Sequence, residues 1–334
     1  MARRNRARRR GSVIDVEHTS EAREHVQQAY ENVLRVILGK DRVVQLLFAA
    51  MLADGHVLIE DVPGVGKTTL VRAIAQSFGC TFKRIQFTPD LLPTDVTGVS
   101  VYDQESGRFL FRPGPIMANI VLADEINRTS PKTQAALLEA MEERAVTVDG
   151  ERHPLPDPFL VMATQNPIEY EGTFPLPEAQ LDRFLIKVHL GYLSREEEIR
   201  LLREWQDRVS PEALQPVATA QHLRSARSEV QQVYVEESLQ RAIVAFVQST
   251  RELSVVALGA SPRASLGWMR LAQASAYLAG RSYVTPEDLQ PLAVPILAHR
   301  LVLTPQARMD GVKAESLVEE LVAKWPSAMR RGAR

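Results

Sequence analysis

Residues 56–74, HVLIEDVPGVGKTTLVRAI, place an apolar segment, a glycine-containing turn and an amphipathic segment in direct succession. An apolar strand that passes through glycines into a helix is typical of a parallel α/β fold. The phosphate-binding consensus of such loops is Gly, four residues, then Gly-Lys-Ser/Thr. Gly66, Lys67 and Thr68 match it, whereas Asp61 stands in place of the first glycine. The pattern therefore predicts a phosphate-binding loop with one departure from the consensus.

The residues of this loop suit an anion. Gly64 and Gly66 let the backbone curl, because glycine adopts positive φ angles without steric cost. The helix that follows directs its free N–H groups and its positive dipole end at the same point. We expect Lys67 to neutralise the β- and γ-phosphates of ATP and the Thr68 hydroxyl to hold Mg²⁺. The predicted nucleotide contacts of the loop are Val62, Pro63, Gly64, Val65, Gly66, Lys67, Thr68 and Thr69.

Short apolar segments alternate with amphipathic ones through the first two hundred residues, which predicts a parallel sheet with crossover helices. Two segments, 119–124 and 159–164, are almost wholly apolar, as expected for strands covered on both faces. The predicted strands are 56–60, 81–87, 119–124, 159–164 and 184–190. The fold class is therefore α/β, with an αβα core around a parallel sheet.

The pattern becomes helical after Gly191. Ser194 and Glu197 have the spacing of a capping box, and Ser261-Pro262 and Thr285-Pro286 each place a capping residue before a first-turn proline. We expect three parts: a basic arm over 1–20, a nucleotide-binding core over 21–192 and a smaller all-helical lid over 193–334.

A second motif, NIVLADEINR, ends a predicted buried strand with the carboxylates of Asp124 and Glu125. The carboxyl ends of parallel strands form the edge at which such sheets bind ligands, and the glycine loop lies at the same edge. We expect Asp124 to reach Mg²⁺ through water and Glu125 to act as general base on the attacking water.

Three further polar residues extend the predicted site. Asn166 follows the strand at 159–164, where its amide could orient water or a phosphate oxygen; a turn asparagine before proline is the alternative. Arg183 ends the segment LPEAQLDRF, before the last predicted strand. Arg263 lies in the first turn of a predicted helix, where a cation opposes the helix dipole, so an external anion such as a γ-phosphate is a natural partner. An exposed arginine without a ligand is the alternative for Arg263.

In order and spacing, EDVPGVGKT, LADEINR, KTQAALLEAMEER, ATQNP and LPEAQLDRF resemble the signature segments of AAA+ ATPases of the MoxR family, over about residues 25–325. The resemblance implies a Walker A loop at 61–68 and a Walker B motif at 120–125. It also implies sensor 1 at Asn166, an arginine finger at Arg183 and sensor 2 at Arg263.

The same resemblance accounts for Asp61, because relatives of this kind tolerate a residue other than glycine at the first loop position. It further implies that residues 37–39, which end in Gly39, line the adenine pocket.

Two segments read as inserted hairpins. AVTVDGERH (145–153) alternates around Asp149-Gly150, a type I′ turn signal, and VSVYDQESGRFLF (99–111) places Gly107 in its turn. We expect the second hairpin to fall inside the second helix of the core. Together they resemble the helix-2-insert group of AAA+ proteins, which includes MoxR proteins, magnesium chelatase ATPase subunits and some nucleic-acid motors. Surface hairpins without a mechanical role are the alternative.

Composition bears on the compartment of the protein and on the partners that it can bind. The single cysteine, Cys80, excludes a disulfide framework and indicates a reducing, cytoplasmic compartment. No apolar run reaches the roughly 18 residues of a membrane helix, so we do not expect an integral membrane protein. The first ten residues, MARRNRARRR, hold six arginines and no acid, which leaves 34 basic and 41 acidic residues elsewhere, a net charge of −7. An acidic body argues against general duplex binding, and like-charged arms are usually disordered and solvated.

We therefore expect a Mg²⁺-dependent ATPase that works as a homo-oligomeric ring, a hexamer, and remodels or matures a partner protein. The resemblance implies clients with von Willebrand factor type A domains and a link to metal-cofactor insertion. The alternative is a nucleic-acid motor, a helicase or translocase, for which the basic arm is the positive sign. A nucleotide-gated scaffold with slow hydrolysis is a third class, against which Glu125 and Arg183 argue.

Overall fold

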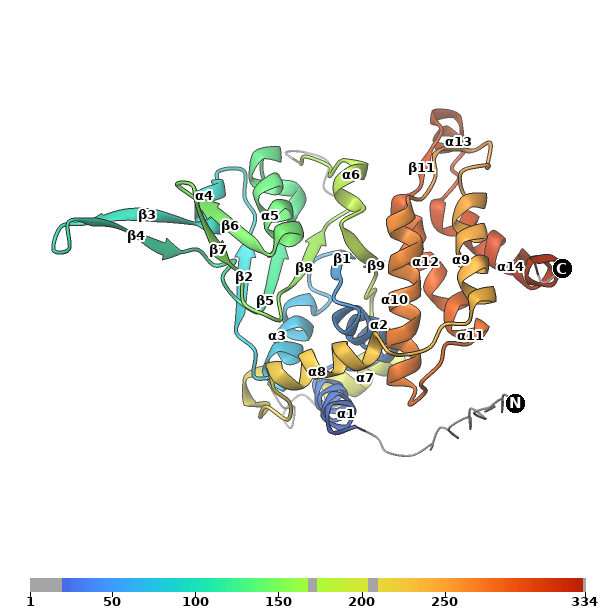
Figure 1. Cartoon of the computed structure of the whole chain (residues 1–334), viewed down its shortest axis with the longest axis horizontal. Coiled ribbons are helices and arrows are strands. Elements are labelled where there is room, and N and C mark those ends of the chain that lie inside the picture. The colour runs from blue at the N-terminus through green and yellow to red at the C-terminus, as the bar shows by residue number, and fades with distance from the viewer. Residues whose placement is uncertain (1–19, 168–172, 204–209, 333–334) are drawn as a thin grey trace, which may run out of the picture.

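The computed structural model describes residues 20–167, 173–203 and 210–332, so the predicted basic arm lies outside it except for Ser20. Five parallel strands form the central sheet in the order β2-β5-β8-β1-β9 (Figure 1). Their bounds are β1 (His56–Glu60), β2 (Phe82–Gln86), β5 (Ile120–Asp124), β8 (Leu160–Gln165) and β9 (Phe184–Val188). All five strands predicted from the sequence are confirmed.

Helices cover both faces of this sheet, and the side-chain alternation of β5 shows how. Ile120 and Leu122 belong to a core shared with the helices over 41–52 and 67–77, whereas Val121 and Ala123 belong to a second core shared with the helix over 131–143. Every residue of β5 is buried, which confirms a strand covered on both faces. The αβα core predicted from the sequence is therefore confirmed. Its helices are α1 (Glu21–Leu34), α2 (Asp41–Leu52), α3 (Lys67–Ser77), α4 (Pro93–Thr97), η1 (Ile126–Arg128), α5 (Pro131–Glu143) and α6 (Glu178–Leu181).

The C-terminal part is helical, as predicted, and packs beside the sheet (Figure 1). Three aromatic rings pack together there, those of Trp268, Phe246 and Trp325, with ring centroids 5.0–5.2 Å apart. A short antiparallel ribbon of β10 (Val256–Leu258) and β11 (Val302–Leu303) was not anticipated. The helices are α7 (Arg195–Arg203), η2 (Pro211–Ala213), α8 (Ala220–Val230), α9 (Glu237–Ser249), α10 (Pro262–Leu278), α11 (Pro286–Leu289), η3 (Gln290–Leu292), α12 (Ala293–Leu297), η4 (Ala298–Arg300), α13 (Pro305–Met309) and α14 (Ala314–Gly332).

One apolar core runs from α1–α3 into α9, α10 and α12 without interruption. The predicted boundary at 192/193 falls between β9 and α7, and it stays a prediction because the packing is continuous across it.

Both predicted hairpins are present. β6 (Ala145–Val148) and β7 (Glu151–Pro154) turn through Asp149 at φ 51° and Gly150 at φ 84°, the two positive angles of a type I′ turn. β3 (Gly98–Asp103) and β4 (Arg108–Pro113) form the second hairpin, which projects from the body (Figure 1). The stacked rings of Phe111 and His153, with centroids 3.8 Å apart, join the two hairpins.

The structure corrects the expectation that the β3–β4 hairpin falls inside the second helix of the core. The five-residue α4 directly precedes β3, and the described segment 114–119 between β4 and β5 contains no helix. Pro113 and Pro115 flank Gly114 there, and prolines remove the donors that a helix needs. The hairpin therefore replaces most of that helix instead of interrupting it.

Candidate nucleotide site and a distant arginine pair

The glycine loop joins β1 to α3 as the sequence predicts. Gly64 and Gly66 have φ angles of 87° and 90°, and a Cβ added at either would meet no heavy atom of the described residues within 4 Å. Lys67 is the first residue of α3, and its Nζ donates to the carbonyls of Asp61 at 2.9 Å and Val62 at 3.1 Å. The loop thus encloses open space at a helix N-terminus, an arrangement that fits a phosphate chain.

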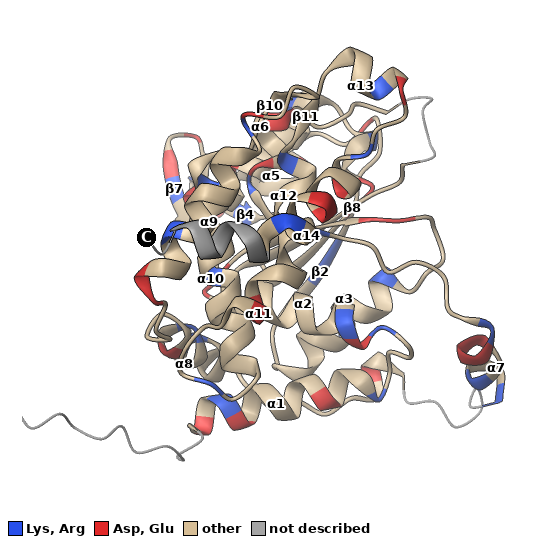
Figure 2. Ribbon diagram, turned by 90° about the vertical axis from the view of Figure 1, so that its right-hand side faces the viewer, with Lys and Arg blue, Asp and Glu red and all other residues tan. Residues whose placement is uncertain are grey.

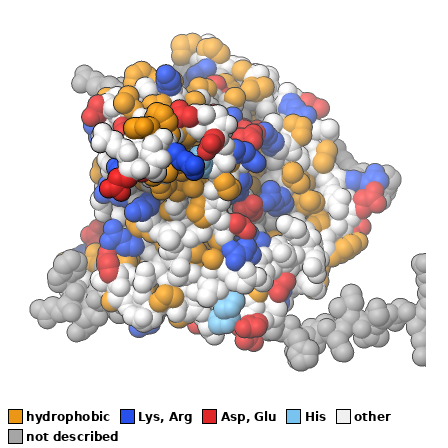
Figure 3. Space-filling view, turned by 60° about the vertical axis from the view of Figure 1, so that its left-hand side comes forward, with side chains coloured by type: hydrophobic (Ala, Val, Ile, Leu, Met, Phe, Trp, Pro, Cys, Tyr) orange, Lys and Arg blue, Asp and Glu red, His pale blue; other side chains and the backbone are white. Residues whose placement is uncertain are grey.

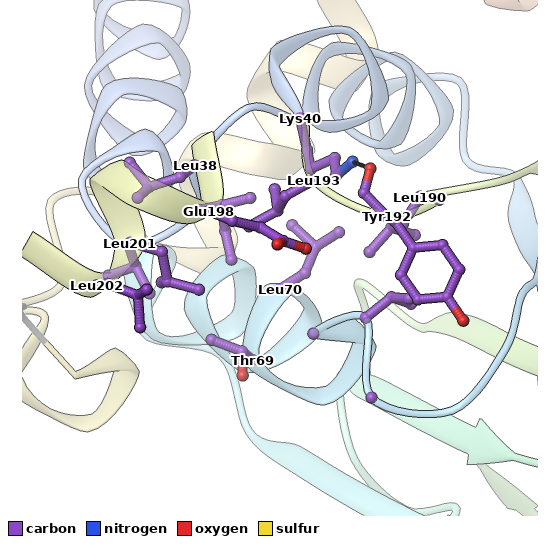
Figure 4. Close-up of a pocket in the computed structure, with 16 residues that line it drawn as sticks. Leu38, Lys40, Thr69, Leu70, Leu190, Tyr192, Leu193, Glu198, Leu201 and Leu202 are labelled. Carbon is purple, nitrogen blue, oxygen red and sulfur yellow. Dashed lines mark hydrogen bonds between the residues drawn. The ribbon is translucent and has the colours of Figure 1, made fainter. Parts of the chain in front are cut away.

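A cavity of about 410 Å³ lies beside the loop (Figure 4). Ile37 and Leu38 line it, as the resemblance implied, together with aliphatic side chains of α7. Gly39 is outside the lining among the described residues; its φ of 66° makes the turn that brings its two predecessors into the cavity. Lys40 Nζ donates to the Tyr192 carbonyl at 2.8 Å and ties the far wall to this turn. An apolar cavity next to a phosphate loop suits a purine base.

The structure explains why aspartate takes the first loop position. Asp61 is buried, with 7% exposure, and its Oδ2 accepts the N–H groups of Leu190 and, at 3.0 Å, Gly191. Both residues line the cavity. Asp61 therefore fastens the chain after β9 to the loop, a task for which glycine has no side chain.

The acidic motif at the end of β5 is held from two sides. Thr164 Oγ1 donates to Asp124 Oδ1 at 2.6 Å, and Arg84 donates to Asp124 Oδ2 through Nη2 at 2.6 Å and Nε at 3.0 Å. The fully buried Thr164 also accepts the backbone N–H of Glu125 at 2.8 Å. Thr164 and Arg84 were missed in the sequence, because their partners lie on neighbouring strands.

Glu125 has backbone angles of φ 58° and ψ 49°, a conformation that a non-glycine residue adopts at a cost and that clusters at functional sites. Its Oε2 accepts Gln86 Nε2 at 2.7 Å and Arg128 Nη1 at 3.0 Å. Gln86 ends β2 opposite Asp124 and was also missed. These donors orient the Glu125 carboxylate at the carboxyl edge of the sheet.

The groups that could hold a divalent cation, as the sequence predicts, are the Thr68 hydroxyl and the Asp124 carboxylate. Both are hard oxygen ligands, the type that Mg²⁺ prefers, so the residues fit this ion.

Asn166 follows β8 and is buried, and the Asp61 N–H donates to the Gln165 carbonyl at 3.0 Å. The exits of β1 and β8 are therefore neighbours, which brings Asn166 beside the glycine loop.

Arg183 and Arg263 lie at the opposite end of the sheet, where the parallel strands begin. Arg183 directly precedes β9, and both arginines line a second cavity, of about 290 Å³, together with Gly55 and His56 at the start of β1. Starts of parallel strands share one edge and their ends share the other. The structure thus separates these two arginines from the glycine loop of their own chain.

Glu142, near the end of α5, pairs with both arginines. Its Oε2 lies 3.0 Å from Arg183 Nη2, and its Oε1 accepts Arg263 Nη2 at 2.6 Å. The hydrogen bond from Arg263 is the main cause that lowers the pKa of Glu142, and the charges of both arginines add to it. Ser261 directly precedes α10, but its hydroxyl donates to Asp182 Oδ2 at 2.9 Å instead of capping the helix.

Comparison with known proteins agrees with this arrangement. Residues 56–186 match the model of the ATPase family associated with various cellular activities, and residues 248–321 match the AAA lid domain. A crystal structure of a candidate ATPase from Cytophaga hutchinsonii superposes with a TM-score of 0.85 at 39% identity, covering 91% of this chain and 94% of that chain. The fold and the loop thus define an AAA+ ATPase, an enzyme that hydrolyses ATP.

Two curated relatives narrow the class. The YeaC protein of Bacillus subtilis is 55% identical over 307 residues, which are 92% of this chain and 96% of that protein. The chaperone MoxR1 of Mycobacterium tuberculosis is 44% identical, with 89% of this chain and 81% of that protein covered. The chain belongs to the MoxR family of AAA+ ATPases. Within the described residues, no helix is both long enough and apolar enough to span a bilayer.

Proposed function

We propose that the protein hydrolyses ATP with Mg²⁺ as a homo-oligomeric ring, a hexamer, and uses the cycle to remodel or mature a client protein in the cytoplasm. The observation that carries the ring is the separation of Arg183 from the glycine loop: Arg183 lies where the parallel strands begin and the loop lies where they end. An arginine at that edge serves a nucleotide when a second copy presents its loop there, and arginines supplied in trans are known from related phosphoryl transfers.

The residues at the carboxyl edge divide the chemistry. Lys67 and the N–H groups of the loop bind the phosphates, and Asp124, held by Thr164 and Arg84, keeps its carboxylate in place. Mg²⁺, when bound through Thr68 and Asp124, neutralises phosphate charge. Glu125 takes the proton of the attacking water, and Asn166 orients that water. Because Gln86 and Arg128 occupy Glu125 Oε2, its Oε1 is the oxygen assigned to the proton.

The client part of the proposal rests on the family and on one surface. The M. tuberculosis relative is named a chaperone, which supports a protein client here. The β3–β4 hairpin carries exposed apolar side chains, with Phe109 72% and Tyr102 53% exposed, as a surface that handles proteins would. A client with a von Willebrand factor type A domain follows from the family resemblance.

Charge on the body supports a protein client over a nucleic acid. Basic and acidic segments are interspersed along the ribbon (Figure 2), and blue and red side chains intermix on the face that carries the hairpins (Figure 3). A nucleic-acid groove would instead gather Lys and Arg side chains into one continuous positive patch. The helicase alternative predicts that DNA stimulates hydrolysis at low salt, and we expect no stimulation.

The experiment that tests the ring is turnover per subunit as a function of protein concentration, with assembly followed by analytical ultracentrifugation. We expect turnover per subunit to rise as monomers assemble. Constant turnover down to a confirmed monomer would contradict the ring.

A further inference from the structure

Glu142 links two parts of the fold through two cations. It belongs to the last turn of α5, while Arg183 precedes β9 and Arg263 lies in the first turn of α10. Each carboxylate oxygen holds one guanidinium, at 3.0 Å and 2.6 Å. The side chains of Arg183 and Arg263 are 30% and 57% exposed, so both remain accessible to a ligand.

The carboxylate of Asp182, next to Arg183 in the sequence, already has two hydrogen-bond partners. Asp182 accepts Arg300 Nε at 2.8 Å and the Ser261 hydroxyl at 2.9 Å. The cavity as a whole is lined by five arginines and three carboxylates, an excess of positive charge that favours an anionic ligand. Its charged lining residues are Arg144, Arg183, Arg263, Arg270, Arg300, Asp54, Glu142 and Asp182.

A carboxylate between two guanidinium groups offsets their mutual repulsion and fixes their geometry. A guanidinium has five N–H donors in a rigid fork, and each contact with Glu142 uses one terminal nitrogen, Nη2. Among the described residues, no other hydrogen bond is made by either guanidinium, so the remaining donors are available to phosphate oxygens. The pairing therefore orients the arginines without consuming them.

We propose that Glu142 is a positioning residue that couples Arg183 and Arg263 into one unit, which binds the terminal phosphate of the ATP held by a neighbouring copy of the chain. This inference rests on the proposed ring. Glu142 is the ion-pair partner of both arginines among the described residues, so its removal takes away the contact that orients Arg263 and the one that aims Arg183.

The test compares Glu142→Ala and Glu142→Gln with wild type by steady-state ATPase kinetics and by binding of a fluorescent ATP analogue. Misplacing reacting groups by about 1 Å can cost about 10²-fold in rate, so we expect kcat of Glu142→Ala to fall by about 10–100-fold. KM and analogue binding should stay near wild type, because the glycine loop is at the other edge. Glu142→Gln keeps one acceptor oxygen and should retain intermediate activity. Glu143→Ala, on the next residue of α5 and exposed, is the matched control and should behave as wild type.

Two further measurements separate positioning from general damage. Mixing Glu142→Ala with Lys67→Ala subunits should restore activity, because the former supply intact loops and the latter intact arginines. Thermal unfolding of each variant confirms the fold.

Unchanged or raised kcat in Glu142→Ala, with Arg183→Ala inactive, would overturn the role of Glu142 and leave the proposed ring standing. A mixture of Glu142→Ala and Lys67→Ala that assembles but gains no activity, while the mixture of Arg183→Ala and Lys67→Ala does regain activity, would also overturn that role. Full activity of Arg183→Ala would instead overturn the ring and, with it, this inference.

Discussion

The Asp61 carboxylate accepts the backbone N–H of Gly191 at 3.0 Å, across 130 residues of chain. It joins the exit of β1 to the segment after β9 and closes one side of the nucleotide cavity. The loop position that departs from the general consensus is thus a structural anchor of the same site.

Asp61→Gly restores the general consensus, yet we expect it to damage the protein. Two backbone N–H groups lose their charged acceptor, and an unsatisfied buried donor costs about 1–3 kcal/mol. Urea unfolding should show a free energy of unfolding lower by about 2–4 kcal/mol, and KM for ATP should rise. Asp61→Asn, which keeps one acceptor oxygen, should lose less. An Asp61→Gly variant with the free energy of unfolding and the KM for ATP of wild type would contradict the anchoring role of Asp61.

Thr164→Val tests the support beneath the acidic motif. The replacement has nearly the same shape but leaves the buried Glu125 N–H without an acceptor and removes a donor to Asp124. We expect about 1–3 kcal/mol of lost stability and a higher Mg²⁺ concentration for half-maximal activity. Thr164→Ser keeps the hydroxyl and should stay close to wild type. Equal Mg²⁺ dependence in the valine variant would show that the hydroxyl does not support Asp124.

The buried histidine His56 should make stability depend on pH. Burial, aided by the charge of Arg144, lowers the pKa of His56 to about 3, and Nδ1 accepts the Val161 N–H at 2.9 Å. Because the folded pKa lies below the unfolded value of 6.5, protonation of His56 favours the unfolded state. The contribution of neutral His56 to the free energy of unfolding is therefore complete above pH 6.5 and is lost as pH falls from 6.5 toward 3. Each such histidine contributes a slope of about 1.4 kcal/mol per pH unit.

Chemical unfolding between pH 6.5 and 5 should show this slope, together with that of His299, whose pKa burial also lowers. His56→Gln should reduce the slope, whereas His189→Gln, at an exposed position, serves as control. A slope unchanged in His56→Gln would contradict a neutral buried imidazole.

Local pattern was sufficient for much of this structure. Apolar runs predicted the five strands, and Asp149-Gly150 predicted its turn, because both signals are carried by adjacent residues. The roles of Asp61, Thr164 and Gln86 depend on contacts between strands that are far apart in the sequence, so no local pattern shows them. The same holds for Arg263, whose helix was predicted although its pairing with Glu142 was not.

Binding and hydrolysis should separate cleanly at the carboxyl edge. Lys67→Ala removes the cation to which we assign the binding of the phosphates, so binding of a fluorescent ATP analogue should be lost. Glu125→Gln should bind the analogue normally while kcat falls by about 10²–10⁴-fold, the usual cost of a missing general base. Failure of the glutamine variant to bind would contradict the role of Glu125, and the variant is also suited to trapping the client.

The most direct test of the ring mixes Arg183→Ala with Lys67→Ala subunits. Each variant alone should be inactive, since one lacks the arginine and the other lacks a working loop. Random assembly at equal concentrations pairs an intact loop with a neighbour's intact arginine at about a quarter of the interfaces. We expect the mixture to regain a corresponding share of wild-type ATPase activity. A mixture that stays inactive, while light scattering shows mixed rings, would contradict the account that Arg183 acts on a neighbouring subunit's nucleotide.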